Sequence, residues 1–277
     1  MGADTETKII KRLSELEKGE GGLPLLLQFY HGLFLVQAAA RRRIGAPRHG
    51  LTGEAIRERL QRGAPLLGVD DLNLDPALVR ELFVKVRGVF SGYPGLFGDI
   101  PAKPETGHAI TGEAIKAWFD GGELPRSAQD GVGETTMRAM IHFTIKPLLT
   151  AYAESFAPSI EPEQWRRRYC PVCGGIPDMA FLDKERGARW LLCSRCDYAW
   201  LFHRLQCPGC GTQDQNALAF FTDDKELYRL HVCERCKCYL KTIDLRRADG
   251  EVLMPLERLL TVDMDKQALA AGYRLPG

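Results

Sequence analysis

The sequence predicts a multidomain α+β protein with an all-helical N-terminal domain, two tandem four-cysteine metal modules and a C-terminal helix. Three observations predict it. All the cysteines lie in one segment, the chain before them shows helical spacing and capping residues, and a Pro/Ser-containing stretch at 157–162 separates the two parts. The predicted parts are the helical domain (1–160), the first module (161–204), the second module (205–250) and the helical tail (251–277).

The first domain is predicted to be helical because capping residues precede stretches of helically spaced apolar residues. Thr52 and Thr111 are predicted N-caps, and Asp75 is one followed by proline at the first helical position. Pro147 predicts a kink. The two threonines lie in nearly identical hexapeptides, which a duplication or two independent helix starts would explain. The predicted helices cover residues 8–16, 23–40, about 53–61, 76–90, 112–121 and 133–156.

The most hydrophobic run, residues 23–40, is short and polar for a membrane span. Its 18 residues include Pro24, Gln28, His31, Gly32 and Gln37. We interpret it as a helix buried in a bundle, with His31 as a hydrogen-bonded core residue and not a ligand. No membrane insertion is expected.

Composition and charge are those of an ordinary soluble protein, with 45% hydrophobic residues, 26% charged residues and a formal charge of +1. Eight thiolates would subtract eight charges and two divalent ions would return four, which leaves −3. This balance favours no nucleic-acid partner. Residues 1–20 are polar and unlike a secretory signal. Because metal-binding thiols need a reducing compartment, a cytoplasmic location is expected.

Eight of the nine cysteines form four Cys-x-x-Cys pairs, separated by 19, 10 and 22 residues. Two such turns together complete a tetrahedral four-sulfur site. The long gaps suit a hairpin and the short gap suits a connector, so two sites in tandem are predicted. The predicted metal ligands are Cys170, Cys173, Cys193 and Cys196 at the first site, and Cys207, Cys210, Cys233 and Cys236 at the second. Iron and zinc both suit four sulfurs, so two metal ions of either kind are expected.

Each module repeats the same design. Its first turn reads Cys-Pro-x-Cys-Gly and its second carries arginine, which indicates a duplicated rubredoxin-like or zinc-ribbon module. Gly174 and Gly211 permit a left-handed backbone that lets N–H groups face the sulfurs. One hairpin per module is predicted, and the tail from about 255 to 273 is predicted to be helical. The hairpins pair 179–183 with 189–192, and 217–221 with 227–231.

Cys238 lies outside the four pairs. We interpret it as an unligated thiol packed beside the second site, while a substitute ligand and a reactive thiol are alternatives. His203 and His231 lie near cysteine turns as possible hydrogen-bond donors to the sites. The sequence contains no phosphate-binding loop, Gly-x-Ser-x-Gly motif or zinc-type His-Glu motif. No catalytic residues are therefore assigned, and the protein is not expected to be an enzyme.

Over its last 105 or so residues the chain resembles the FdhE-type formate dehydrogenase accessory proteins. The segments that carry the resemblance are 170–177, 192–200, 207–211, 233–236, 239–241 and 263–273. The resemblance implies a helical domain joined to two rubredoxin-like modules whose cysteines bind metal, with iron associated with the family. It also implies a cytoplasmic maturation factor that binds the molybdenum- or tungsten-containing catalytic subunit of a respiratory formate dehydrogenase before export. Cys238 departs from the family pattern, which expects another residue before Tyr239.

Three functions compete at this point. The leading one is a non-enzymatic assembly factor for the formate dehydrogenase catalytic subunit, which we call the client. The second is a rubredoxin-like iron protein that passes electrons to that client. The third is a zinc-ribbon nucleic-acid binder, which the run Arg166-Arg167-Arg168 favours. However, residues 161–250 hold 15 Lys and Arg against 13 Asp and Glu, so the charge argument for the third is weak.

Overall fold

The computed structural model describes residues 3–19, 22–101, 110–126 and 131–276. Contacts divide the chain into two compact units: unit 1 combines residues 1–49 with 67–152, and unit 2 combines 50–66 with 153–277. Residues 50–66 therefore belong with the cysteine segment and not with the surrounding helices. The four domain ranges predicted from the sequence (1–160, 161–204, 205–250 and 251–277) remain predictions.

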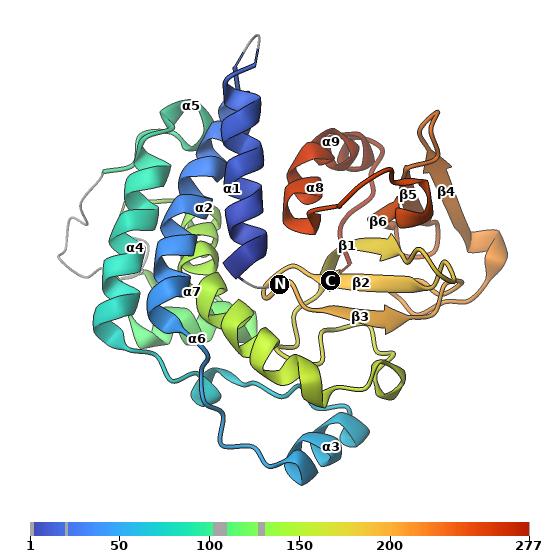
Figure 1. The fold of residues 1–277 in the computed structure, drawn as a ribbon, viewed down its shortest axis with the longest axis horizontal. Coiled ribbons are helices and arrows are strands. Elements are labelled where there is room, and N and C mark those ends of the chain that lie inside the picture. Colours follow the sequence, from blue (N-terminus) through green and yellow to red (C-terminus); the bar gives the residue numbers. More distant parts are fainter. Residues whose placement is uncertain (1–2, 20–21, 102–109, 127–130, 277) are drawn as a thin grey trace. The chain divides into compact units, whose positions relative to one another are not determined.

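Unit 1 is helical, and Figure 1 shows α1, α2 and α4 running side by side. Its core contains aromatic rings, since Phe29 lies 4.9 Å from Phe90 and 4.6 Å from Phe97 between ring centroids. Such pairs bury large apolar areas and fix how helices pack. The helices are α1 (Ala3–Glu17), α2 (Leu25–Ile44), α4 (Pro76–Ser91), α5 (Pro94–Phe97), α6 (Gly112–Asp120) and most of α7 (Glu134–Phe156).

The predicted N-caps are confirmed. Thr52 accepts from the backbone N–H of Ala55 at the start of α3 (Gly53–Arg62), which belongs to unit 2. Thr111 accepts from Ala114 in the same way at the start of α6 in unit 1. The nearly identical hexapeptides thus form the same local cap in two different units, because capping depends only on neighbouring residues.

Helix α7 continues through Pro147 to Phe156. A proline cannot donate to the carbonyl four residues before it, which here belongs to Phe143. The buried side chain of Gln37 in α2 supplies the missing donor, with 2.9 Å between Nε2 and the Phe143 oxygen. A side chain from one helix therefore completes the hydrogen bonding of another.

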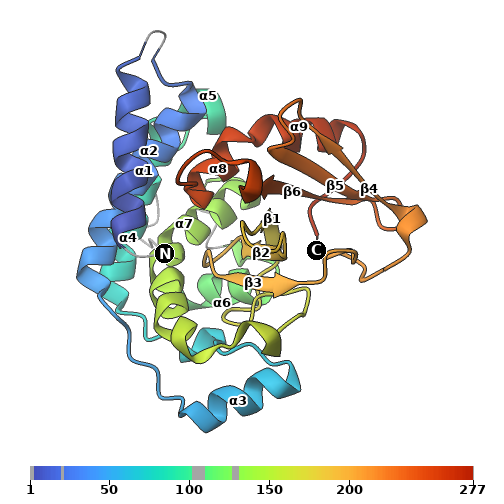
Figure 2. The same cartoon turned by 45° about the vertical axis from the view of Figure 1, so that its right-hand side comes forward.

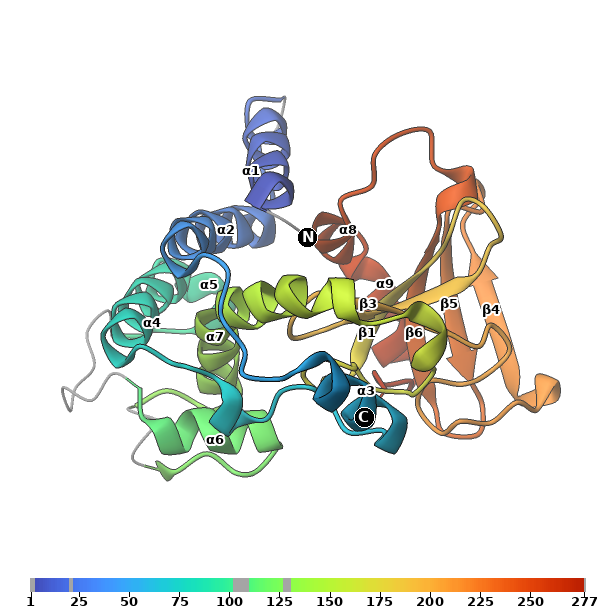
Figure 3. The same cartoon turned by 60° about the horizontal axis from the view of Figure 1, so that its bottom comes forward.

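Unit 2 contains one six-stranded sheet with the order β3-β2-β1-β6-β5-β4. The two predicted hairpins, β1–β2 and β4–β5, are confirmed, whereas β3 and β6 were not predicted. In Figure 3, β1, β6, β5 and β4 follow one another toward the β4 edge. The strands are β1 (Pro177–Leu182), β2 (Arg189–Cys193), β3 (Ala199–Phe202), β4 (Leu218–Thr222), β5 (Tyr228–Cys233) and β6 (Cys238–Asp244).

The two metal modules share this sheet. Each contributes three antiparallel strands, and the parallel pair β1–β6 joins them, from Met179 opposite Lys241 to Leu182 opposite Asp244. Every residue of β6 is buried. The modules are therefore continuous, and the arrangement is that of a zinc ribbon repeated within one sheet.

The predicted helical C-terminal tail is confirmed, and it consists of two short helices, α8 (Met254–Leu260) and α9 (Val262–Ala270), which meet at Thr261. Figure 2 shows them beside the strands of the sheet, and Ala268 packs on Val232 and Tyr239. The buried Lys241 holds both helices, since its Nζ donates to the Arg258 carbonyl and to Asp265 at 2.9 and 2.6 Å. Within the described ranges, no helix combines the length and apolar character needed to cross a membrane.

Candidate metal centres

All four Cys-x-x-Cys turns have the same backbone. In each, the N–H four residues after the first cysteine donates to that cysteine's carbonyl at 2.8–3.2 Å. The donating residue is always left-handed, with φ of 69° at Gly174, 58° at Asp197, 77° at Gly211 and 55° at Lys237. Sequence reasoning found this conformation only at the two glycines. Asp197 and Lys237 occupy the same position after their cysteine pairs as Gly174 and Gly211 do. That equivalence was the signal for a left-handed residue that sequence reasoning missed.

The first group of four sulfurs is compact and enclosed. Cys173 Sγ lies 3.5 Å from that of Cys193 and 3.6 Å from that of Cys196, and all four cysteines are buried. A tetrahedral ion with metal–sulfur bonds of about 2.3 Å requires sulfurs roughly 3.8 Å apart, whereas a disulfide requires about 2.05 Å. The geometry excludes disulfides here and could hold one metal ion. The group consists of Cys170, Cys173, Cys193 and Cys196.

The second group has the same spacing but a different environment. The Sγ atoms of Cys207 and Cys236 are 3.6 Å apart, and those of Cys210 and Cys233 are 3.8 Å apart. Cys207 and Cys233 are buried, Cys236 is half-buried and Cys210 is exposed. These four cysteines could hold a second ion, at a site that opens to solvent on the Cys210 side.

Backbone N–H groups face the sulfurs. The amide of Arg195 donates to Cys193 Sγ at 3.4 Å, and those of Gly209 and Cys210 donate to Cys207 Sγ at 3.3 and 3.4 Å. The hydrogen bond from Cys238, together with these two amides, lowers the pKa of Cys207 to about 4 against the opposing effect of burial. Donors of this kind stabilise thiolate, which is the form that binds metal.

Cys238 lies against the second group. It is buried, its Sγ is 3.3 Å from that of Cys207, and it forms the first residue of β6 opposite Cys233. A Cβ on Gly209 would approach the same sulfur to 2.8 Å, so the absence of a side chain at Gly209 lets the turn pack closely on Cys238. The ninth cysteine is therefore beside the group of four and not a member of it.

The α3 segment of unit 2 packs on the first turn of the first site. The Leu66 N–H donates to the Pro171 carbonyl at 2.9 Å, and the Tyr169 hydroxyl donates to the Gly63 carbonyl at 2.8 Å. Pro171 lies between Cys170 and Cys173, so residues 50–66 support this Cys-x-x-Cys turn, or knuckle. No local pattern in the sequence indicated the contact, because more than 100 residues separate its partners.

The two histidines named from the sequence have different positions. His203 is exposed, with its ring 6.1 Å from that of Phe202. His231 lines a cavity beside the second group of cysteines, and its Nε2 has no hydrogen-bond partner. Burial and the nearby Arg189 lower its pKa to about 3, so this histidine is neutral.

The comparisons with known proteins agree on one family. A family model described as "FdhE, central domain" matches residues 169–204. The chain is 33% identical over 227 residues to a "Protein FdhE homolog" of Aquifex aeolicus, which is 80% of this chain and 76% of that protein. A homologue from Stutzerimonas stutzeri is 34% identical over 109 residues, 38% of this chain and 35% of its own length. The crystal structure of the FdhE protein from Pseudomonas aeruginosa shares the fold, with a TM-score of 0.64, 22% identity, and coverage of 99% and 94% of the two chains.

Proposed function

This chain belongs to the FdhE family, and we propose from that membership that it is a formate dehydrogenase accessory protein. In the proposed role it acts in the cytoplasm, binds the molybdenum- or tungsten-containing catalytic subunit of a formate dehydrogenase, and aids maturation of that subunit without being an enzyme. The observation that carries the proposal is the pair of four-cysteine groups in one continuous sheet.

We assign one tetrahedral iron or zinc ion to each group of four cysteines. The sulfur spacing, the amides that face the sulfurs and the shared knuckle backbone support this assignment. When bound, such an ion supplies folding free energy, about 10–16 kcal/mol in zinc-finger peptides. The cysteine residues hold the turns at the ends of the strands, and the sheet with its helices then offers a rigid surface to the client.

Recovery of the client tests the proposal. A tagged full-length chain is produced in anaerobically grown cells that make a formate dehydrogenase, and co-purifying proteins are identified by mass spectrometry. We expect strong enrichment of the catalytic subunit with the wild type. We expect loss of it when Cys173 and Cys196, or Cys210 and Cys236, are both replaced by serine. Cys238→Ser is the matched control that removes a thiol outside both groups. Fully metal-loaded protein that never enriches the subunit would contradict the proposal.

Electron transfer to the client is a second candidate function, favoured by one observation. The second site reaches the surface at Cys210 and Cys236, which would bring an iron ion close to a partner. Amide donors to sulfur, present at Cys207, also tune iron–sulfur potentials. Protein purified without oxygen would then contain iron, show thiolate-to-iron absorption and bleach reversibly with dithionite. Colourless protein that contains only zinc would exclude this function.

A nucleic-acid partner is not expected. The arginines at 166–168 contact neighbouring protein groups: Arg166 pairs with Glu163, Arg167 lies 5.5 Å from the Trp165 ring, and Arg168 donates to the Gly209 carbonyl. One of the three charges is thus paired with a carboxylate, and the segment 161–250 has only two more basic than acidic residues, which is a weak basis for binding phosphates. Mobility shift of single- or double-stranded DNA or RNA at low salt would overturn this expectation.

A further inference from the structure

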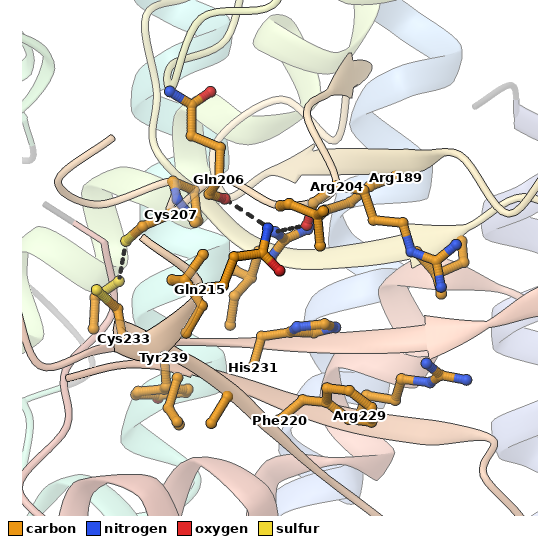
Figure 4. Close-up of a pocket in the computed structure, with 18 residues that line it drawn as sticks. Arg189, Arg204, Gln206, Cys207, Gln215, Phe220, Arg229, His231, Cys233 and Tyr239 are labelled. Atoms are coloured by element: carbon orange, nitrogen blue, oxygen red, sulfur yellow. Dashed lines mark hydrogen bonds between the residues drawn. The ribbon is translucent and has the colours of Figure 1, made fainter. Parts of the chain in front are cut away.

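A cavity of about 250 Å³ lies in unit 2 beside the second site, and nothing in the proposed maturation role uses it. It lies on the sheet face that carries Phe220 and His231, which pair with each other across β4 and β5. Side chains alternate between faces along a strand, so this face is opposite the one where Val232 packs on α9. Figure 4 shows Phe220, Arg229 and His231 together with Cys207 and Cys233 of the second site.

The cavity holds three arginines beside the thiols of the second site. Arg189, Arg204 and Arg229 line it, and none of the described residues that line it is acidic. Arg229 donates from Nη2 to the buried Asp244 at 2.8 Å, so one of these charges has a carboxylate partner. The side chain of Arg204 is exposed. Among the described residues that line the cavity, Arg189 has no carboxylate partner, and the negative charge near it is that of the Cys207 thiolate.

Arg189 is almost completely buried, with 3% of its surface exposed. Its Nη1 donates to the carbonyls of Gln206 and Arg204 at 3.2 and 3.5 Å, while Nε and Nη2 have no partner. These two nitrogens form one edge of the guanidinium, and their parallel N–H groups match the two oxygens of a carboxylate. His231 Nε2 and Arg229 Nε, on the same cavity, also have no partner.

The walls are apolar where the cavity meets solvent. Phe220 is 51% exposed and Leu205 is 58% exposed, and the side chains of Leu218 and Leu240 lie further in. Ligand sites commonly combine such walls with a few convergent polar groups. A bound molecule would therefore place a charged group inside and an apolar group at the rim.

We propose that this cavity binds an organic carboxylate, with the carboxylate on the free edge of Arg189 and the apolar part against Phe220 and Leu205. The carboxylate can belong to a small molecule or to the C-terminus of a polypeptide that ends in an apolar residue. The proposal does not rest on the maturation role, since the cavity and its unpartnered donors exist in the chain itself.

Calorimetry on the metal-loaded full-length chain tests the chemistry. Phenylacetate is the small probe and phenylacetamide its uncharged control, and a pentapeptide ending in phenylalanine is compared with its C-terminal amide. We expect at least tenfold tighter binding of one or both free carboxylates than of the matching amide. Preference for phenylacetate identifies a small-molecule site, and preference for the free peptide identifies a polypeptide site. Equal binding of acid and amide in both pairs, or no binding, overturns the proposal.

Variants locate the binding in the cavity. Arg189→Lys keeps the charge but removes the two-pronged edge, and we expect at least tenfold weaker binding. Leu205→Gln removes the apolar contact at the rim and should weaken binding slightly, whereas Leu205→Glu also places a negative charge there and should weaken it about tenfold further. If Arg189→Lys does not fold, the comparison of the two Leu205 variants alone tests whether the ligand binds in the cavity. Arg247→Gln removes an exposed arginine whose partner is Glu226 and should change nothing. Unchanged binding in Leu205→Glu and in any folded Arg189→Lys would show that Arg189 only offsets thiolate charge.

Discussion

Arg258 in α8 donates from Nη1 to Oδ1 of Asp197 at 2.8 Å. Asp197 is the left-handed residue that ends the second turn of the first metal site. The same guanidinium donates to the carbonyl of Cys193 at 3.2 Å and pairs with Asp178 in β1. One arginine of the C-terminal helices therefore holds a knuckle and a strand of the first module together, and the tail is part of the metal-binding structure.

Arg258→Gln is expected to weaken the first site. The change leaves Asp178 and Asp197 without their cation, and removing one partner of a largely buried pair costs about 3–5 kcal/mol. A loosened knuckle should release its ion several times faster to a colorimetric chelator. Arg247→Gln, which removes an exposed ion pair, is the control. Identical release from both variants and the wild type would show that α8 does not support the site.

The two sites should lose their ions in a defined order. A chelator or a competing thiol reagent reaches the second site through the exposed Cys210, whereas the four sulfurs of the first site are buried. Release from the wild type should therefore be biphasic, with the second site at least tenfold faster. Variants with one site destroyed assign the phases: Cys173→Ser should leave only the fast phase and Cys210→Ser only the slow one. A single phase for both ions would contradict the exposure argument.

Cys238→Ala should retain two bound ions. Its sulfur lies 3.3 Å from that of Cys207 but outside the group of four, so the tetrahedron is complete without it. Cys207→Ala should retain one ion, because a central member of the group is lost. Metal content per chain, measured after purification without oxygen, separates the two results. Loss of one ion from Cys238→Ala would make the ninth cysteine a ligand.

The cysteine groups could be predicted from the sequence because the chemistry of a knuckle is local. Two cysteines three positions apart define a turn, and helix caps such as Thr52 depend equally on near neighbours. The hairpins β1–β2 and β4–β5 join strands that follow each other in the chain. The alternation of side chains along each strand and the turn residues between the strands were therefore enough to predict them.

The sheet as a whole could not be predicted because its joining strand looks polar. β6 contains Lys241, Thr242 and Asp244, all of them buried. Their polar groups are largely satisfied by residues elsewhere: Lys241 by Asp265, and Asp244 by Arg229 and Arg246. The parallel pairing of β6 with β1 is also distant in sequence. The same holds for Arg189, whose role beside the second site depends on contacts that no spacing rule describes.

Alkaline pH should destabilise the packing of α8 and α9 on the sheet. Tyr228 donates to Glu257 of α8, and Tyr239 to Asp265 of α9, at 2.6 and 3.0 Å. Burial, reinforced by these carboxylates, raises the pKa of both phenols well above the ordinary value of 10.0. The unfolded chain then loses these protons first as pH rises. Their contribution to stability is complete below pH 10 and falls above it, by up to about 1.4 kcal/mol per pH unit for each phenol.

Absorbance of tyrosinate at 295 nm measures this effect. Of the eight tyrosines, Tyr228 and Tyr239 should remain protonated above the ordinary pKa and ionise together with unfolding, as should Tyr198, whose pKa burial also raises. Tyr228→Phe and Tyr239→Phe should each remove one delayed ionisation and cost about 1 kcal/mol at pH 7 through the lost hydrogen bond. Titration of all tyrosines as one class near pH 10 would contradict the prediction.

The hydrogen bond from Gln37 to the Phe143 carbonyl predicts a coupling between Gln37 and Pro147. Gln37→Leu leaves that partly buried carbonyl without its donor and should lower the free energy of unfolding by about 1–3 kcal/mol. Pro147→Ala restores an N–H four residues after Phe143, so Gln37→Leu should cost at least 1 kcal/mol less in that background. Gln28→Leu is the matched control, since Gln28 lies in the same helix but donates to the Leu23 carbonyl, and its cost should be the same with Pro147 or Ala at position 147. Additive effects of Gln37→Leu and Pro147→Ala in denaturant unfolding would show that the glutamine does not replace the donor that the proline lacks.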